Sequence, residues 1–135
     1  MNDATAELVA AARAVCGNFR LSEVCEDFAA GGVGAAIRTA SGNIYTGICI
    51  DLACGLGFCA EVAAISDMLK HRETHIVEVV AVAGSGGSKI IPPCGRCRET
   101  MSQVDPRNID CRVILEDDRA VLLRDLLPEY WMGLK

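Results

Sequence analysis

The sequence predicts a layered α/β domain in which helices cover a β-sheet. Helical and strand patterns follow one another in the order helix, hairpin, helix, strand, helix and two strands, and such an order is typical of helices packed on a sheet. A chain of 135 residues with 51% hydrophobic side chains can bury one substantial core. Because no repeat, low-complexity tract or linker interrupts it, we expect residues 1–135 to form a single domain.

The first part of the chain predicts a helix followed by a hairpin. The stretch ATAELVAAARAVC has apolar residues at helical spacing, so a helix should begin after Asn2 or Asp3. Two strand-like segments, residues 33–40 and 43–50, flank the turn sequence ASGN and predict a β-hairpin. The glycine-broken stretch DLACGLGF at 51–58 should then be a loop.

The remainder predicts two helices and three strands. A helix is expected at 59–72, a buried strand at 75–84, a second helix at 94–104 after a proline pair, a strand at 109–115, and a strand that finishes as a helical turn at 120–128. Only about two to four residues link the last two strands, whereas a crossover between parallel strands needs about a dozen or more. These two strands should therefore pair antiparallel.

Composition excludes several classes of protein. A net charge of −5 argues against nucleic acid as a partner, because neutralising phosphates requires a basic face. No apolar run approaches the roughly 20 residues that span a bilayer, and the first residues lack a signal-peptide pattern. We therefore expect a cytoplasmic protein without membrane contact, in which the eight cysteines are free or metal-bound thiols rather than disulfides.

Cys94 and Cys97, in the stretch IIPPCGRCRE, form a Cys-x-x-Cys pair. This spacing alone fits a redox couple, half of a structural zinc site or part of a catalytic one. Cys59 stands where a glycine-rich loop enters a helix, just as the pair stands where a proline-led loop enters another. Three thiolates at two helix N-termini are sensible Zn²⁺ ligands, since the partial positive charge there stabilises thiolate over thiol.

The number of ligands indicates which kind of zinc site this is. Structural zinc is usually closed by four protein ligands, whereas catalytic zinc keeps one position open for water. Glu61, two residues after Cys59, can lean over the open position as a general acid and base without binding the metal. The five other cysteines are expected to be small buried hydrophobes: Cys16, Cys25, Cys49, Cys54 and Cys111.

Cys59-Ala60-Glu61 together with Pro93-Cys94-Gly95-Arg96-Cys97 matches the signature of zinc deaminases. The chain resembles the zinc-dependent cytidine deaminase superfamily in these motifs, in the stretches VGAAI and GNIYTGICID, and in the LLP at 126–128. It is most similar to the small three-cysteine branch of cytidine and blasticidin-S deaminases. The resemblance implies a three-layer α/β fold with a mixed five-stranded sheet flanked by helices. It also implies one Zn²⁺, a homotetramer, and hydrolytic release of ammonia from an aminopyrimidine nucleoside or analogue.

The resemblance also implies which residues hold the substrate. The Ala60 backbone N–H and a carbonyl near Pro92 should orient the ring. Cys49 and Asp51 stand where nucleoside-binding relatives have Asn and Glu against the ribose, and Gly31 stands where they have an aromatic residue. The aromatic residues expected to rebuild the pocket, within one subunit or from a neighbouring one, are Phe28, Phe58, Tyr130 and Trp131.

Three thiolates on Zn²⁺ leave a net charge of −1, which makes a bound water less acidic. Many relatives place an arginine directly after the glutamate to donate to the ligand sulfurs, but this position is Val62 here. We expect Arg96 to take over this charge compensation, with Arg98 as the second choice.

Other functions stay open at this level. The chain could deaminate a non-nucleoside amino-heterocycle or a purine base, or be a zinc-stabilised scaffold that has lost catalysis. A thiol oxidoreductase would explain the Cys-x-x-Cys pair but neither Cys59 nor Glu61. The histidines His71 and His75, near the end of a predicted helix, are expected to favour its C-terminal dipole rather than bind metal.

Overall fold

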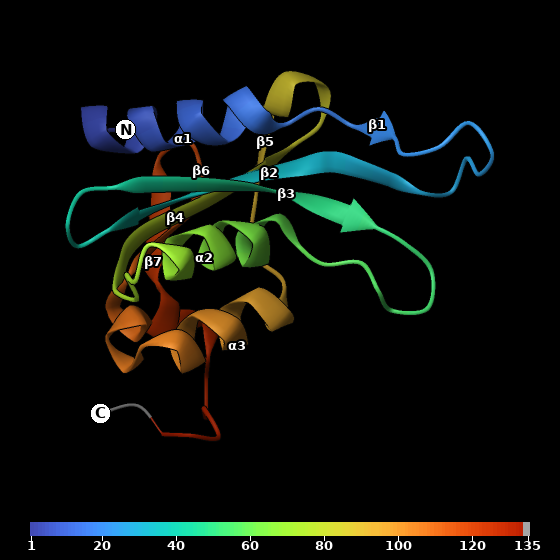
Figure 1. Cartoon of the computed structure of the whole chain (residues 1–135). Helices are drawn as coiled ribbons and strands as arrows, with labels where there is room; N and C mark the ends of the chain where they lie inside the picture. Colours follow the sequence, from blue (N-terminus) through green and yellow to red (C-terminus); the bar gives the residue numbers. More distant parts are fainter. Residues whose placement is uncertain (134–135) are drawn as a thin grey trace.

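A single sheet divides the molecule into two faces, with α1 on one and α2 and α3 on the other (Figure 1). The computed structural model describes residues 1–133. The helices are α1 (Asp3–Val15), α2 (Ala60–Lys70) and α3 (Gly95–Val104), with short 3₁₀ turns η1 (Ser85–Gly87), η2 (Pro106–Asp110) and η3 (Leu123–Leu126). The strands are β1 (Phe19–Arg20), β2 (Ala29–Thr39), β3 (Ile44–Asp51), β4 (Ile76–Ala83), β5 (Lys89–Ile91), β6 (Arg112–Glu116) and β7 (Arg119–Leu122).

The sheet is mixed, as expected. Its five longer strands lie in the order β3, β2, β4, β6, β7; β4 and β6 run parallel and every other pair is antiparallel. The prediction that the last two strands are antiparallel is confirmed. The prediction of five strands was short by two, because β1 pairs with the start of β2 and β5 with the end of β4. Two- and three-residue strands carry too little periodic signal to be recognised in the sequence.

The side chains of β4 alternate between the two faces of the sheet and show how the three layers pack. Val80 and Val82 pack with Leu8, Val9 and Ala12 of α1. The intervening Val79 belongs to a second cluster that lies on the other face, with residues of α2 and α3: Ala64, Ile65, Met68 and Met101. Successive side chains of a strand point to opposite faces, so β4 is buried on both sides and ties the two cores together.

Two strands begin at other residues than predicted. β2 begins at Ala29 rather than residue 33, and its register with β3 shifts between Ala30 and Gly34. β6 begins at Arg112 rather than residue 109, because Pro106–Asp110 form a 3₁₀ turn. Buried Asn108 holds this turn: its amide donates to the carbonyls of Thr74 and Met101 and its oxygen accepts from the Ile76 N–H. A local sequence pattern does not report these distant partners.

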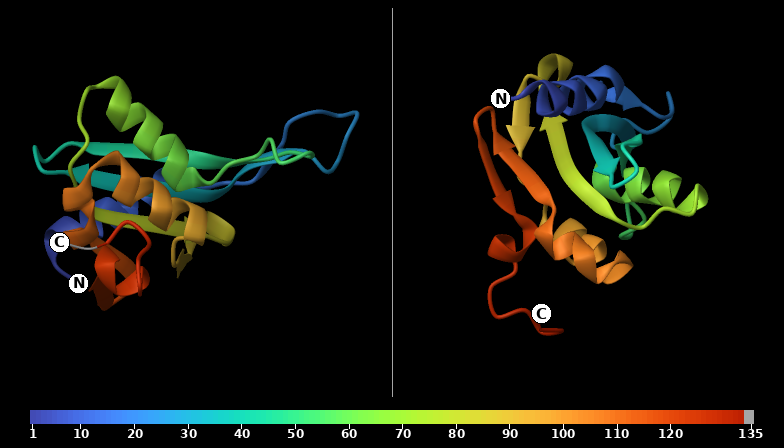
Figure 2. Two further views of the ribbon diagram at one scale, coloured as in Figure 1. Left: turned by 90° about the horizontal axis from the view of Figure 1, so that it is seen from below. Right: turned by 90° about the vertical axis from the view of Figure 1, so that its left-hand side faces the viewer.

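The loops at 21–28 and 51–58 extend beyond the sheet at one end of the molecule (Figure 2). At the base of the second loop the backbone groups of Ile50 and Phe58 exchange two hydrogen bonds of 3.0 Å. This loop leads directly into α2. Within residues 1–133, no helix is long and apolar enough to cross a membrane.

Candidate active site

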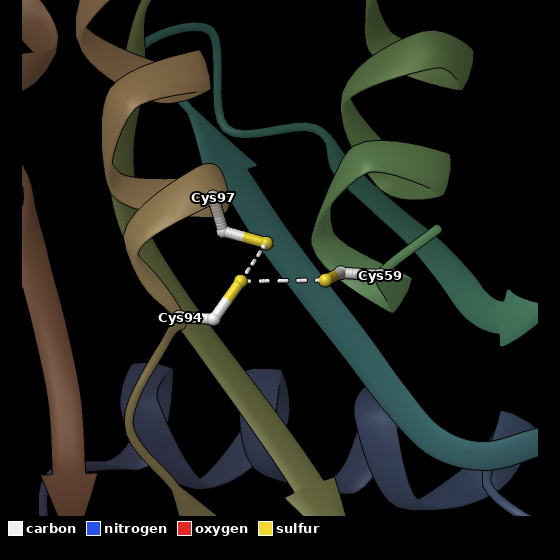
Figure 3. Close-up of side chains that lie close together, drawn as sticks. All are labelled: Cys59, Cys94 and Cys97. Atoms are coloured by element: carbon white, nitrogen blue, oxygen red, sulfur yellow. Dashed lines mark hydrogen bonds between the residues drawn. The ribbon is translucent and has the colours of Figure 1, made fainter. Parts of the chain in front are cut away.

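Three cysteines from two helix starts converge on one point (Figure 3). The Sγ atom of Cys94 lies 3.4 Å from that of Cys59 and 3.5 Å from that of Cys97. All three sulfurs lie within 4.8 Å of one another. The structure thus brings together the three residues that the sequence singles out, although 35 positions separate Cys59 from Cys94.

The two helices aim their N-termini at this point. Cys59 and Cys94 are the N-cap residues of α2 and α3, both with extended backbone, and neither side chain caps its own helix. Their sulfurs are therefore free for another partner. α2 can lie this close to the sheet because β3 has a glycine beneath it: a Cβ on Gly47 would meet Ala64 N at 2.4 Å and Ala60 O at 2.6 Å.

The thiols differ in burial and in pKa. Cys97 is buried, Cys59 half-buried and Cys94 exposed. Burial raises the pKa of Cys97, helped by the nearby carboxylate of Glu61, and burial also raises that of Cys59. Burial acts in the same direction on Cys94, but the backbone N–H groups of Cys97 and Arg96 and the neighbouring sulfurs outweigh it and lower its pKa. Cys94 is therefore the first of the three to become a thiolate.

Glu61 lies in the first turn of α2 and is only 4% exposed. Burial raises the pKa of its carboxyl group, against the opposing effects of its own backbone N–H and the Cys97 thiol. No salt bridge joins it to a cation in the described part of the chain. A buried carboxyl group with a raised pKa is suited to carrying a proton near neutral pH.

A cavity of about 630 Å³ opens in front of Cys59, Cys94 and Glu61. It is lined by most of the residues that the sequence suggests for the substrate: Cys49, Asp51, Phe58, Ala60 and Pro92. Trp131 is not among them. It is 73% exposed, and its indole N–H donates at 2.8 Å to the carboxylate of Glu99, which lies in the middle of α3 and does not line the cavity.

Two further wall residues, both apolar, were not predicted. Val33 lines the cavity, and its backbone N–H donates to the Sγ atom of Cys49 at 3.2 Å. Ile91 at the end of β5 faces the same space. Both are apolar residues in short or irregular strand segments, and nothing in their sequence context separates them from ordinary core residues.

The two arginines beside the cysteines have partners other than sulfur. Arg96 lines the cavity, and its Nη1 donates to the Gly57 carbonyl at 3.4 Å. Arg98 donates from Nε to the Pro93 carbonyl at 2.8 Å and from Nη1 to the Leu126 carbonyl at 3.4 Å. In the described chain neither arginine donates a hydrogen bond to a ligand sulfur. His71 ends α2 as its C-cap, in line with the dipole role expected for it.

The three sulfurs form a donor set that fits Zn²⁺. Thiolates bound at about 2.3 Å to one tetrahedral zinc ion lie roughly 3.8 Å apart, and the observed separations of 3.4 and 3.5 Å are close to this value. Within residues 1–133, this is the one group of three or more His, Cys, Asp or Glu side chains whose ligand atoms lie close enough together to hold a metal ion. Three ligands leave a fourth position for a non-protein group.

The chain is similar in sequence to known deaminases. No family model matches the chain. It is 34% identical over 106 residues to the blasticidin-S deaminase of Bacillus cereus, which covers 71% of this chain and 74% of that protein. It is 32% identical over 101 residues to the cytidine deaminase of Halalkalibacterium halodurans, with the same coverage.

Solved structures agree with the relatives found by sequence. The cytidine deaminase of Mycobacterium tuberculosis superimposes with a TM-score of 0.77 at 26% identity, over 99% of this chain and 100% of that one. The cytidine deaminase of Burkholderia pseudomallei gives a TM-score of 0.73 at 26% identity, over 97% and 100% of the two chains. The three-layer fold predicted from the sequence is therefore confirmed.

Proposed function

We propose a specific catalytic arrangement from one premise: this chain belongs to the cytidine deaminase family. It is a hydrolytic deaminase of an aminopyrimidine nucleoside or analogue. In the proposed arrangement Cys59, Cys94 and Cys97 hold one Zn²⁺ and Glu61 transfers protons. The observation that carries it is that three sulfurs converge at the edge of one cavity, which is lined by two of these cysteines, Cys59 and Cys94, and by the buried Glu61.

The zinc ion, when bound, supplies a Lewis acid that makes water nucleophilic near neutral pH. The protein's part is to hold it with three sulfurs and to leave the fourth position facing the cavity. Cys59 and Cys94 both line that cavity. The N-termini of α2 and α3 offset part of the negative charge of the thiolates.

Glu61 is the proton carrier in this proposal. Deamination adds water at the ring carbon that bears the amino group and breaks the carbon–nitrogen bond. One proton must therefore move from water to the ring nitrogen, and another to the leaving amine, which departs as ammonia. Glu61 accepts the first proton and delivers it, then returns the second, because burial raises the pKa of its carboxyl group towards the working pH.

Backbone groups orient the ring. The Ala60 N–H lies at the first turn of α2, where a helix leaves its N–H groups without intrahelical partners. The Pro92 carbonyl remains an acceptor although proline has no donor. We assign both to the ring, Phe58 to its apolar edge, and Cys49 and Asp51 to the substituent that the ring carries, since all of these residues line the cavity.

Metal analysis and an ammonia assay test the proposal together. The purified chain should contain one zinc per chain and release ammonia from at least one member of a panel of cytidine, deoxycytidine, cytosine, blasticidin S and aminopurines. A zinc-containing chain for which Glu61→Ala changes no measurable property would instead be a scaffold. A metal-free chain with a reducible Cys94–Cys97 disulfide would be a thiol oxidoreductase. Activity on aminopurines alone would move the substrate class to purines.

Finer properties extend the proposal. We assign residues 1–135 to one deaminase domain, supported by the single sheet that runs through it. A cytoplasmic homotetramer is proposed from the resemblance. Association of subunits is supported by apolar side chains exposed on the two extended loops, Val24 at 95% and Leu56 at 69%, since large exposed apolar groups favour association. Light scattering after size exclusion should give four times the mass of one chain.

A further inference from the structure

Arg98 joins two segments that are far apart in the sequence. Its side chain is half-buried and folds back from the first turn of α3, so that Nε donates to the Pro93 carbonyl at 2.8 Å. The same guanidinium donates from Nη1 to the Leu126 carbonyl at 3.4 Å, across 28 positions of sequence. A planar guanidinium can hold two acceptors at once, which a single ammonium group does less well.

The Pro93 carbonyl belongs to a short segment between β5 and α3 that is poor in backbone hydrogen bonds, although Pro93 itself is buried. β5 ends at Ile91, and the two prolines that follow have no N–H to donate. In the part of the chain that the structure describes, Arg98 supplies the one side-chain hydrogen bond to this carbonyl. The peptide that begins at this carbonyl leads directly into Cys94.

Cys94 is the thiol that most needs such a restraint. It is exposed, so little packing holds it, while Cys97 is fully buried. Its sulfur also lies between the other two, 3.4 Å from Cys59 Sγ and 3.5 Å from Cys97 Sγ. A displacement of its backbone would therefore separate it from both neighbours and open the donor triangle.

The other end of the Arg98 bridge is anchored in the core. Leu126 closes η3, and Leu123 at the start of this turn is fully buried. The Leu123 N–H donates to the Cys111 carbonyl at 3.0 Å, next to the start of β6. Arg98 thus ties a segment with few backbone hydrogen bonds to a turn that the core fixes.

We propose that Arg98 is a positioning residue that holds the peptide before Cys94 and so pre-forms the metal site. The inference rests on the proposed function only in taking Cys94 as a metal ligand. It gives Arg98 a role other than donating to the ligand sulfurs. The expected effect follows from partners that orient metal ligands in general, whose loss weakens metal binding by roughly 10- to 100-fold.

The test uses Co²⁺ as a spectroscopic substitute for zinc in the full chain. Wild type, Arg98→Gln, Arg98→Lys and the control Arg124→Gln are titrated with Co²⁺, and the thiolate-to-cobalt charge-transfer band gives both affinity and geometry. Zinc affinity follows from competition with a chelator. Arg124 is a matched control because it lies in η3, as Leu126 does, and its side chain pairs with Asp110 at 2.7 Å rather than bridging to the Pro93 carbonyl.

We expect Arg98→Gln to bind Co²⁺ roughly 10- to 100-fold more weakly with an altered band, Arg98→Lys to fall between it and wild type, and Arg124→Gln to match wild type. Wild-type affinity and band in Arg98→Gln, or an equal loss in Arg124→Gln, would overturn the inference. If Arg98→Gln does not fold, Arg98→Lys decides: weaker binding at an unchanged Tm supports it and wild-type binding refutes it. The titrations contain no substrate, so their outcome does not depend on catalysis. If the wild-type chain releases no ammonia but Arg98→Gln still binds Co²⁺ more weakly than wild type, the proposed reaction is refuted and this inference stands.

Discussion

Replacing Gly47 by alanine should damage stability and activity together, because this glycine lies directly beneath the start of α2, which carries Glu61. An added Cβ would lie 2.4 Å from Ala64 N, 2.6 Å from Ala60 O and 2.6 Å from Ala63 Cβ. Two of these atoms are α2 backbone, so no side-chain rotation relieves the contacts. Reaching the 3.4 Å of an ordinary contact requires α2 to move by about 1 Å.

The magnitude follows from two opposing effects. Overpacking of this kind costs about 1–3 kcal/mol, and three simultaneous contacts place Gly47→Ala near the upper end. Removing a glycine from the unfolded chain returns about 0.4–1 kcal/mol. The net loss in the free energy of unfolding should be about 2 kcal/mol, or a fall in Tm of roughly 5–10 °C for a domain of this size.

The same shift should reduce turnover. A displacement of about 1 Å at catalytic groups can cost about 10²-fold, and the moving turn carries Glu61. Urea unfolding gives the stability, and ammonia release from zinc-loaded protein gives kcat. Gly17→Ala is the matched control, since nothing lies within 4 Å of its Cβ position, and it should match wild type or be slightly more stable. Wild-type Tm and kcat in Gly47→Ala would refute the close approach of α2 to β3.

Three further substitutions probe the site and the fold. Glu61→Gln should keep one zinc per chain by metal analysis but lose roughly 10²- to 10⁴-fold in ammonia release; retained turnover would remove Glu61 from proton transfer. Arg96→Gln should keep zinc and lose turnover by roughly 10-fold or more, and near-normal turnover would end its assignment to charge compensation. Tyr45→Phe should reduce acid sensitivity, because the Tyr45 hydroxyl, with Asn43, holds the pKa of Glu73 at about 2, below the ordinary 4.5. This lowered pKa contributes stability that is complete above pH 4.5 and lost as the pH falls towards 2. Unfolding free energies across this window should therefore fall less steeply in Tyr45→Phe, and parallel curves would contradict the assignment.

Much of the fold could be predicted from the sequence because its signals are local. The helix at Asp3–Val15 begins where Asn2 accepts the Thr5 N–H at 2.7 Å, as the capping pattern indicates. The hairpin follows from its turn residues and from alternation in the flanking strands. What the sequence did not predict, such as β1 and the 3₁₀ turn at Pro106–Asp110, depends on pairing and hydrogen bonds between distant residues.

The candidate site was likewise predicted only in part. The convergence of Cys59, Cys94 and Cys97 could be predicted because Cys59 and Cys94 mark helix starts, which are visible in the sequence, and Cys97 follows within the first turn of α3. The expectation that Trp131 joins the pocket was not met within this subunit. Its N–H, the Tyr130 hydroxyl at 2.5 Å and the Gln103 amide at 2.9 Å all donate to Glu99, which keeps this segment on α3. An aromatic residue near a C-terminal turn does not itself indicate which of two surfaces it will contact.

Backbone dipoles can offset part of the negative charge of three thiolates without an arginine hydrogen-bonded to a sulfur atom. Cys94, the most exposed thiol, has its pKa lowered by backbone N–H groups of its own helix turn, and Cys97 lies deepest, next to Glu61. The protein therefore places fixed dipoles at the sulfur that water also reaches, and these dipoles act only while Cys94 keeps its N-cap position. The two arginines of the Cys-x-x-Cys segment bind backbone carbonyls, Arg96 at Gly57 and Arg98 at Pro93 and Leu126. In the proposed arrangement Arg98 preserves these dipoles by holding the backbone before Cys94 in place, and Arg96 adds its positive charge beside the sulfurs.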